Sequence, residues 1–355
     1  MGEHTDYNEG YVLPFALSLG VTATAVARPG RQLVLRSKQV PDEQVTVSLD
    51  ALAPGETTGW AAYPAGVAWA LREAGATISG ASIDIDSDLP AGAGVSSSAA
   101  LECSVALALC SLSGVPAERR SLAAIARRAE NDFVGAPTGI IDQYAALLCE
   151  AGHAMLLDCG TLELNQVPFR PSAGGAVAMI VDTRVPHALV SGEYGKRRAE
   201  CEAAAHLLGV RALGEVADAD ASSRLADPVL RRRARHVISD SARARTIASA
   251  LLSGEPAPDT YRVIGELLTE AHASLRDDFE VSWPAADTTV EVANAAGALG
   301  ARMIGGGFGG SVLALVPADR AVAVRAALTE AFTRRSWTPP EFIDAIPSAA
   351  ARQLA

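Results

Sequence analysis

The most informative segment of this sequence for the fold class is Leu89-Pro-Ala-Gly-Ala-Gly-Val-Ser-Ser-Ser-Ala-Ala100. It lies between a strand-like run at residues 81–86 and a helical run at 99–111. Gly92 and Gly94 lack a Cβ atom, so the backbone can turn with positive φ and approach an anion closely. The serines that follow stand where a helix begins, and the N–H groups of a first helical turn attract phosphate. The stretch predicts a phosphate-binding loop, with a serine-capped helix after a glycine turn as the alternative.

The composition is that of a compact, acidic protein. The 355 residues are 49% hydrophobic and 20% charged, with a net charge of −11, and they suffice for two domains. This charge argues against nucleic acid or an anionic membrane surface as a general partner. The lysines, Lys38 and Lys196, do not follow a glycine-rich loop as Gly-Lys-Ser/Thr. A P-loop NTPase is therefore excluded.

Cysteine usage and hydropathy predict the cellular compartment. The five cysteines form no CxxC pair and lie mostly in apolar runs, which predicts buried free thiols in a reducing environment. No apolar run approaches membrane-spanning length, and the start of the chain lacks the pattern of a signal peptide. We therefore expect a cytoplasmic protein with no membrane partner.

The order of the patterns predicts a mixed α and β chain. Strands are expected at residues 12–27, 34–49, 81–86, 176–182, 301–304, 311–316 and 341–346, with a hairpin at 153–158 and 162–168. Helices are expected at residues 59–73, 99–111, 117–131, 140–150, 193–208, 228–252, 260–274 and 318–333. A Pro-, Ser- and Gly-containing stretch at residues 170–175 predicts a boundary between two domains, residues 1–170 and 171–355.

A second informative segment runs from Glu130 to Asp142. Asp142 follows a turn rich in Gly and Pro, at the start of a predicted helix. Phosphoryl transfer to a hydroxyl needs a group that positions the hydroxyl and takes its proton, and Asp142 suits that role. Glu130 lies one helix earlier, where it could hold Mg²⁺. The alternatives are a carboxylate that complements a helix dipole for Asp142 and a solvated helix end for Glu130.

The third segment is the glycine run Gly305-Gly-Gly-Phe-Gly-Gly310. So many glycines between two apolar strands cost conformational entropy on folding. Their presence implies that the backbone lies close to a ligand or to another chain segment, whereas a tight hairpin turn would need only one or two.

These segments, together with Met1-Gly-Glu-His-Thr-Asp-Tyr-Asn8, resemble the galactokinase family of the GHMP small-molecule kinases. The resemblance covers nearly the whole chain, and its N-terminal motif is the most specific part. It implies an α+β, two-domain GHMP kinase fold, with mixed sheets packed with helices and the active site in the interdomain cleft. It also implies ATP-dependent, Mg²⁺-assisted phosphorylation of the anomeric hydroxyl of galactose. We expect a monomer.

The resemblance also implies roles for individual residues. Asp142 is similar to the catalytic aspartate, and Ser98 and Glu130 to the pair associated with Mg²⁺. The loop around the ATP phosphates corresponds to Gly92, Ala93, Gly94, Val95, Ser96, Ser97 and Ser98. The sugar contacts correspond to Glu3, His4, Asp6, Gly139 and Tyr194. Trp60 and Tyr63 match the helix beside the adenine, although aromatic residues at this spacing are more often core. A buried, hydrogen-bonded histidine is the alternative for His4.

One departure and two other functions stay open. The family has a strand with an arginine just before the Gly-Glu-His-Thr-Asp motif, so we expect either an upstream start codon or a truncated form with impaired chemistry. Another GHMP kinase, acting on N-acetylgalactosamine or a different sugar, is the first alternative. The second is a non-catalytic sensor that binds galactose and ATP. The intact serines of the loop and Asp142 argue against a sensor, and the absent arginine argues for one.

Overall fold

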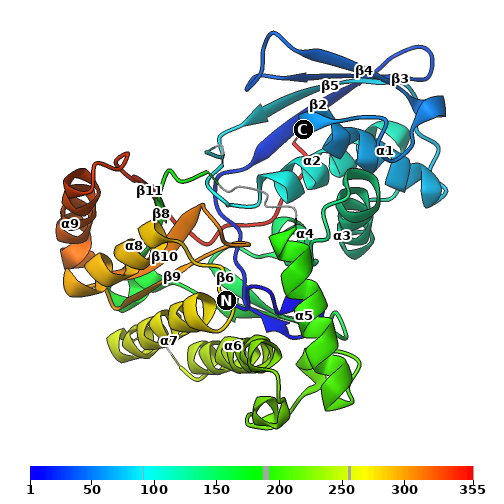
Figure 1. Cartoon of the computed structure of the whole chain (residues 1–355). Coiled ribbons are helices and arrows are strands. Elements are labelled where there is room, and N and C mark those ends of the chain that lie inside the picture. Colours follow the sequence, from blue (N-terminus) through cyan, green and yellow to red (C-terminus); the bar gives the residue numbers. More distant parts are fainter. Residues whose placement is uncertain (91, 187–191, 255–256, 355) are drawn as a thin grey trace. The chain divides into compact units, whose positions relative to one another are not determined.

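The computed structural model describes residues 1–90, 92–186, 192–254 and 257–354 (Figure 1). The chain forms two compact units. Unit 1 consists of Met1–Phe15, Pro90–Val95 and Glu150–Ser348, and unit 2 consists of Ala16–Leu89, Ser96–Cys149 and Ala349–Ala355. This division differs from the expected boundary at residue 170, because β1 (Tyr11–Val12) pairs with β6 (His153–Asp158) and draws the N-terminal segment into unit 1.

Unit 2 is built on a four-stranded sheet of order β2-β5-β3-β4. The strands are β2 (Val21–Ala27), β3 (Gln32–Ser37), β4 (Gln44–Ser48) and β5 (Ala81–Ser87). β5 lies parallel to β3 and antiparallel to β2, so the sheet is mixed. Alternate residues of β5 are buried, which gives the sheet one apolar face.

Helices cover one side of this sheet (Figure 1). They are α1 (Ala62–Glu73), α2 (Ser97–Ser113), α3 (Arg119–Arg128) and α4 (Ile141–Leu148). α2 packs against β2, and a π-helical turn (Ala129–Val134) continues α3. α2 ends where Gly114 adopts a left-handed conformation with φ of 66°, which a glycine takes without strain.

Unit 1 contains two sheets. One is four-stranded and antiparallel, of order β11-β8-β10-β9, and the other has the order β1-β6-β7. The strands not yet introduced are β7 (Leu164–Pro168), β8 (Ala176–Asp182), β9 (Gly300–Met303), β10 (Ser311–Pro317) and β11 (Glu341–Asp344). β8 and β10 are almost entirely buried, as their continuous apolar sequences require.

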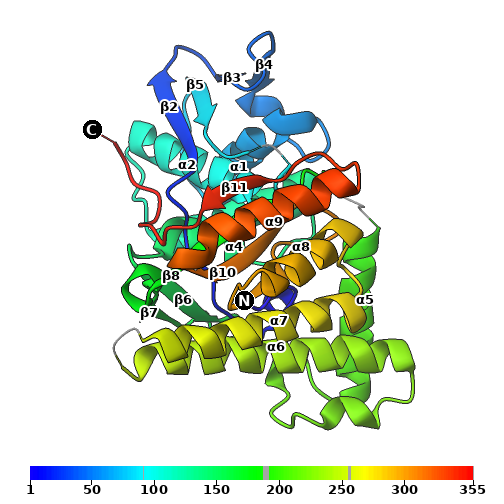
Figure 2. The same cartoon turned by 90° about the vertical axis from the view of Figure 1, so that its left-hand side faces the viewer.

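Unit 1 contains five α-helices among its described residues. They are α5 (Glu193–Leu208), α6 (Pro228–Leu252), α7 (Pro258–Asp277), α8 (Pro284–Ala295) and α9 (Ala321–Arg334). The long α6 is rich in arginine and alanine. α6 and α7 lie side by side (Figure 2). Asp227 caps α6 by accepting hydrogen bonds from the N–H groups of Val229 at 2.7 Å and Leu230 at 3.1 Å.

The α+β class and the hairpin of β6 and β7 are confirmed. Two predicted strands were wrong in extent. The run at residues 12–27 divides into β1 and β2, because Pro14 lacks the N–H group that a strand needs and an irregular segment follows it. The run at residues 34–49 divides into β3 and β4 around a turn that contains Pro41 and Asp42.

All five cysteines are buried free thiols. Within the part of the chain that the structure describes, no helix combines the length and apolarity needed to cross a membrane.

Candidate active site

The N-terminal motif forms a tight loop that is held by its own polar groups. Gly2 has a φ of 91°, and a Cβ atom there would lie 2.6 Å from the carbonyl oxygen of Tyr11, so only glycine fits. The hydroxyl of Thr5 donates hydrogen bonds to the carbonyl oxygens of Gly2 at 2.8 Å and Tyr11 at 2.9 Å. A 3₁₀ turn (Asp6–Asn8) follows and leaves Asp6 7% exposed.

The two side chains between Gly2 and Thr5 are engaged by other parts of unit 1. The carboxylate of Glu3 pairs with the guanidinium of Arg302. His4 Nε2 lies 3.2 Å from the carbonyl oxygen of Gly306, and Nδ1 lies 3.1 Å from the hydroxyl of Tyr7. Because a carbonyl oxygen only accepts, Nε2 carries the hydrogen and the Tyr7 hydroxyl donates to Nδ1. Burial, together with the nearby His236, lowers the pKa of His4 to about 3, so its ring is neutral at neutral pH.

Aromatic rings surround His4. Its ring centroid lies 5.1 Å from that of Tyr194 on α5 and 4.7 Å from that of Phe279. Tyr7 and Tyr194 meet edge to face at 5.5 Å. The structure therefore brings Glu3, His4 and Tyr194, all expected at a sugar site, into one neighbourhood of unit 1.

The glycine run packs against the N-terminal part of the phosphate loop. The hydroxyl of Ser311 donates to the carbonyl oxygen of Ala93 at 2.6 Å. A Cβ atom on Gly310 would lie 3.2 Å from that oxygen, and one on Gly305 would lie 3.0 Å from the carbonyl oxygen of Gly94. Since His4 also contacts Gly306, this run links the N-terminal motif and the phosphate loop within unit 1. The close approach expected from the glycines is confirmed, and its partner includes another chain segment.

The phosphate loop continues into the first turn of α2. Gly92 and Gly94 have φ values of 75° and 67°, as a close backbone turn requires, and Gly92 is exposed. Ser96 precedes the helix with a φ of 58° and makes no side-chain capping bond. The expected serine cap is therefore absent at Ser96, and the N–H groups of the first helical turn are not capped by that side chain.

A group of polar side chains is joined by hydrogen bonds near the start of α4 in unit 2. The hydroxyl of Thr138 donates to Glu130 Oε2 at 2.7 Å, and Gln143 Nε2 donates to the same oxygen at 2.8 Å. Gln143 Nε2 also lies 3.3 Å from Glu102 Oε2. Two buried oxygens, Glu102 Oε1 and Gln143 Oε1, have no hydrogen-bond partner among the described residues.

Glu102 is fully buried on α2, and its environment changes its charge. Burial, and then the negative charge of Glu130, raise the pKa of Glu102 to about 10. The charge of Asp142, in the first turn of α4, acts in the same direction. Burial and the charge of Glu130 also raise the pKa of Tyr63 on α1. Glu102, Glu130 and Asp142 thus form one partly buried acidic cluster, and Tyr63 lies near it.

The remaining expected residues of unit 2 lie in loops or short turns. Gly139 is buried in the segment before α4. Trp60 lies in a 3₁₀ turn (Gly59–Ala61), and its buried Nε1 has no partner among the described residues. Ser98 lies one helical turn before Glu102 on α2, so the two side chains share a face of that helix.

Sequence reasoning missed Glu102, Gln143 and Arg302, and also Asp240 on α6, whose Oδ2 lies 3.4 Å from Nη1 of Arg302. A weak signal existed for Glu102, which is a lone charge in the apolar helical run at residues 99–111. Gln143 is adjacent to Asp142 in the second segment. Asp240 lies among the charged residues of α6, and Arg302 lies in the short strand β9. Neither residue stands out in the sequence as part of a site.

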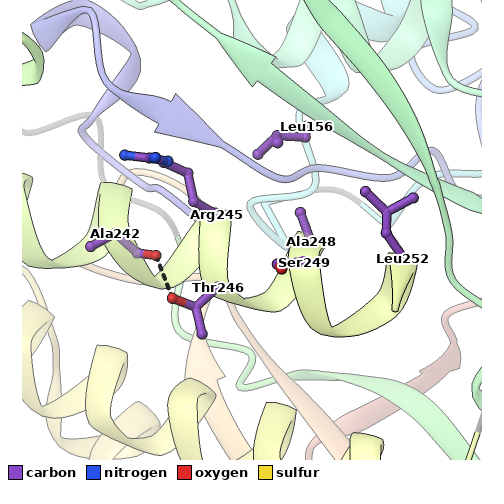
Figure 3. A pocket seen from close by; sticks show the side chains of 7 residues that line it. All are labelled: Leu156, Ala242, Arg245, Thr246, Ala248, Ser249 and Leu252. Atoms are coloured by element: carbon purple, nitrogen blue, oxygen red, sulfur yellow. Dashed lines mark hydrogen bonds between the residues drawn. The ribbon is translucent and has the colours of Figure 1, made fainter. Parts of the chain in front are cut away.

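An open hollow of about 540 Å³ lies apart from these motifs in sequence. Figure 3 shows it lined from α6 by Arg245, Ala248 and Leu252, with Leu156 of β6 opposite. The guanidinium of Arg245 lies 5.2 Å from the ring centroid of Tyr11. None of the lining residues belongs to the three segments or to the N-terminal motif.

Comparison with known proteins gives the class of the chain. The family model of the GHMP kinases N terminal domain matches residues 62–150, and that of the GHMP kinases C terminal matches residues 258–334. The mevalonate kinase structure of Methanococcus jannaschii is 14% identical with a TM-score of 0.65, covering 98% of this chain and 95% of that chain, which is a likeness of fold. The class is that of the GHMP kinases.

Closer relatives narrow the class. The galactokinase galactose-binding signature matches residues 1–28. The galactokinase of Streptomyces coelicolor is 48% identical over 358 residues, which is 100% of this chain and 91% of the relative. The structure of Lactococcus lactis galactokinase complexed with galactose is 33% identical with a TM-score of 0.93, covering 100% of this chain and 92% of that chain. The chain belongs to the galactokinase family.

Proposed function

We propose that this chain transfers the γ-phosphoryl group of ATP to the anomeric hydroxyl of galactose, forming galactose 1-phosphate and ADP. The observation that carries the proposal is similarity to galactokinases along the entire chain, including the galactose-binding signature at residues 1–28. The contact of His4 with the glycine run, and of that run with the phosphate loop, supports it, because an enzyme that joins a sugar to a phosphate needs both elements close together.

Asp142 is the proposed catalytic residue. Its half-buried carboxylate would hold the attacking hydroxyl and accept its proton. Phosphoryl transfer gains most of its rate from positioning and electrostatic stabilisation, so one well-placed carboxylate meets the chemical requirement.

The ATP phosphates are proposed to bind the loop from Gly92 to Ser98. The N–H groups at the start of α2 would face the phosphates, since Ser96 leaves them without a side-chain cap. Trp60 and Tyr63 are the proposed neighbours of the adenine. The buried and unpartnered Nε1 of Trp60 offers a hydrogen-bond donor that a ligand could use.

The acidic cluster of unit 2 fits a magnesium ion. Mg²⁺ prefers oxygen ligands and is commonly held by one or two carboxylates together with phosphates and water. Ser98 and Glu130 are the proposed ligands, and the unpartnered Oε1 of Gln143 is a further oxygen acceptor in this cluster. Phosphate oxygens of ATP and water would complete the shell. When bound, the ion would offset phosphate charge.

Asp6, Tyr194 and Gly139 are the proposed sugar contacts. Short carboxylates and hydroxyls that accept or donate in fixed directions distinguish epimeric hydroxyl groups better than apolar surfaces do. Both ring nitrogens of His4 are engaged, so this side chain would have to exchange a protein contact to reach the sugar. The Glu3 carboxylate pairs with Arg302 through Oε2, and the second oxygen of a carboxylate can still accept from a sugar hydroxyl.

A substrate panel tests the proposal. ATP consumption is measured with galactose, N-acetylgalactosamine, glucose, mevalonate and homoserine, and galactose should give by far the highest kcat/KM. Preference for another compound would indicate a different GHMP kinase. Tight binding of galactose and ATP without turnover would indicate a sensor. A monomeric state and a cytoplasmic location remain predictions from the sequence. Light scattering on the purified protein tests the first.

A further inference from the structure

Arg302 on β9 is a fully buried cation that faces the N-terminal motif. Its Nη2 pairs with the carboxylate of Glu3, and its Nη1 lies 3.4 Å from Asp240 Oδ2. Its Nε donates to the carbonyl oxygen of Met303 at 3.1 Å. A buried guanidinium is tolerated only when its donors are paired, so this fork holds Glu3 firmly.

Asp240 on α6 supplies the second half of the arrangement. It is also fully buried, and its Oδ2 accepts a hydrogen bond from the backbone N–H of Gly2 at 3.0 Å. Burial favours the neutral form, but the charge of Arg302 and further charges nearby outweigh it and lower the pKa of Asp240. Asp240 is therefore an ionised acceptor that anchors the backbone of the motif directly.

The same loop is held from α6 at one more point. His236 Nε2 lies 3.1 Å from the carbonyl oxygen of Glu3, to which it donates. The backbone of residues 2 and 3 is thus fixed by α6, and the side chain of Glu3 is fixed by β9. Asp6 follows three residues later in the same short loop.

We propose that Arg302 and Asp240 are positioning residues for sugar selectivity, which they set by holding Gly2 and Glu3 and hence the loop that presents Asp6. The inference rests on the proposed galactose site. Hydrogen-bond discrimination between epimers needs groups placed to within a fraction of an ångström, and a loop released from buried anchors loses that placement. Neither residue needs to touch the sugar.

The test compares Arg302→Met, the milder Arg302→Lys, and Glu3→Gln with the wild type. Binding of galactose and glucose is measured by calorimetry, and kcat and KM are measured for galactose and ATP. We expect Arg302→Met to raise the galactose Kd and KM about tenfold or more, to reduce the preference for galactose over glucose, and to leave the KM for ATP within about twofold. Arg302→Lys should fall between wild type and Arg302→Met. If Arg302→Met does not fold, the lysine variant and Glu3→Gln carry the comparison.

Arg233→Met is the matched control. Arg233 is 2% exposed, lies in the same unit and pairs with Glu200 and Glu280, but makes no contact with Gly2 or Glu3. The Arg233→Met substitution should lower the thermal stability of the protein without changing its preference for galactose over glucose. Equal losses of preference in both variants, or a parallel rise in the KM for ATP, would show a general structural role and overturn the inference.

The two proposals fail in different ways. A wild-type protein that binds galactose selectively without turnover leaves the inference testable by binding alone, and only the proposed catalysis fails. A wild-type protein that does not bind galactose at all overturns both.

Discussion

Glu102 illustrates how a single buried group couples the active-site region to stability. Its side chain is fully buried, and its pKa is raised to about 10 by burial and by Glu130, so the carboxyl group keeps its proton at neutral pH. Gln143 donates toward both acids, which ties the pair together. A neutral Glu102 avoids placing a negative charge at a fully buried position of this cluster.

Replacing Glu102 with Gln should change how stability depends on pH. The folded wild type keeps the proton up to about pH 10, whereas the unfolded chain releases it near the ordinary value of 4.5. The folded state therefore binds more protons between these values, and its free energy of unfolding falls as pH rises, by up to about 1.4 kcal/mol per pH unit for this group. Urea unfolding at pH 5, 7 and 9 should show a smaller decline for Glu102→Gln.

The exposed Glu291 on α8 offers a control, because Glu291→Gln should leave the wild-type pH profile unchanged. Parallel profiles for the wild type and Glu102→Gln would show that Glu102 is ionised in the folded protein.

Asp142→Asn tests the proposed catalytic residue. The substitution keeps the size of the side chain and removes the charge that would accept the proton. We expect turnover to fall by about a hundredfold or more, with little change in galactose binding. Asp132→Asn, at an exposed carboxylate in the preceding π-turn, should keep normal turnover. Near-normal turnover in Asp142→Asn would remove this residue from the chemistry.

At the scale of elements, the glycine run shows what a local pattern can and cannot reveal. The repeated glycines predicted a close approach of backbone, and the structure shows it: a Cβ atom on Gly307 would lie 2.4 Å from the carbonyl oxygen of Val281. The sequence could not name that neighbour, or Ala93 and Gly94, because these contacts join segments far apart in the chain. The two over-long strands had readable turn signals in Pro14 and in Pro41-Asp42.

Gly307→Ala should be far more destabilising than Gly175→Ala. Both glycines have left-handed φ values, 85° and 73°, and both lie in unit 1. Only Gly307 has atoms within contact distance of the added methyl group. We expect Gly307→Ala to cost about 1–3 kcal/mol more in the free energy of unfolding, the usual cost of overpacking. Chemical unfolding of both variants measures the difference. Equal losses of unfolding free energy would mean that the strain of the positive φ alone, and not the contacts of the methyl group, sets the cost.

For the whole molecule, the sequence predicted the α+β class and the family, and it singled out the N-terminal motif, the phosphate loop and the glycine run. It did not predict that unit 1 would take in Met1–Phe15 and Pro90–Val95, because that assembly depends on long-range contacts such as the pairing of β1 with β6. The buried pair of Asp240 and Arg302 was missed for the same reason. Single charged residues in a helix or a strand look like surface residues until the fold buries them.

We propose above that this chain phosphorylates galactose on its anomeric oxygen. The most direct measurement is ³¹P NMR of the product formed from ATP and galactose, which shows the carbon to which the new phosphate is attached. We expect one phosphoryl ester, coupled to the proton on carbon 1 and formed in equal amount with ADP, at a turnover in the usual kinase range of about 1–100 s⁻¹. We expect almost none with Asp142→Asn. A phosphate on another hydroxyl, or no sugar phosphate from a folded protein that binds ATP and galactose, would contradict the proposal.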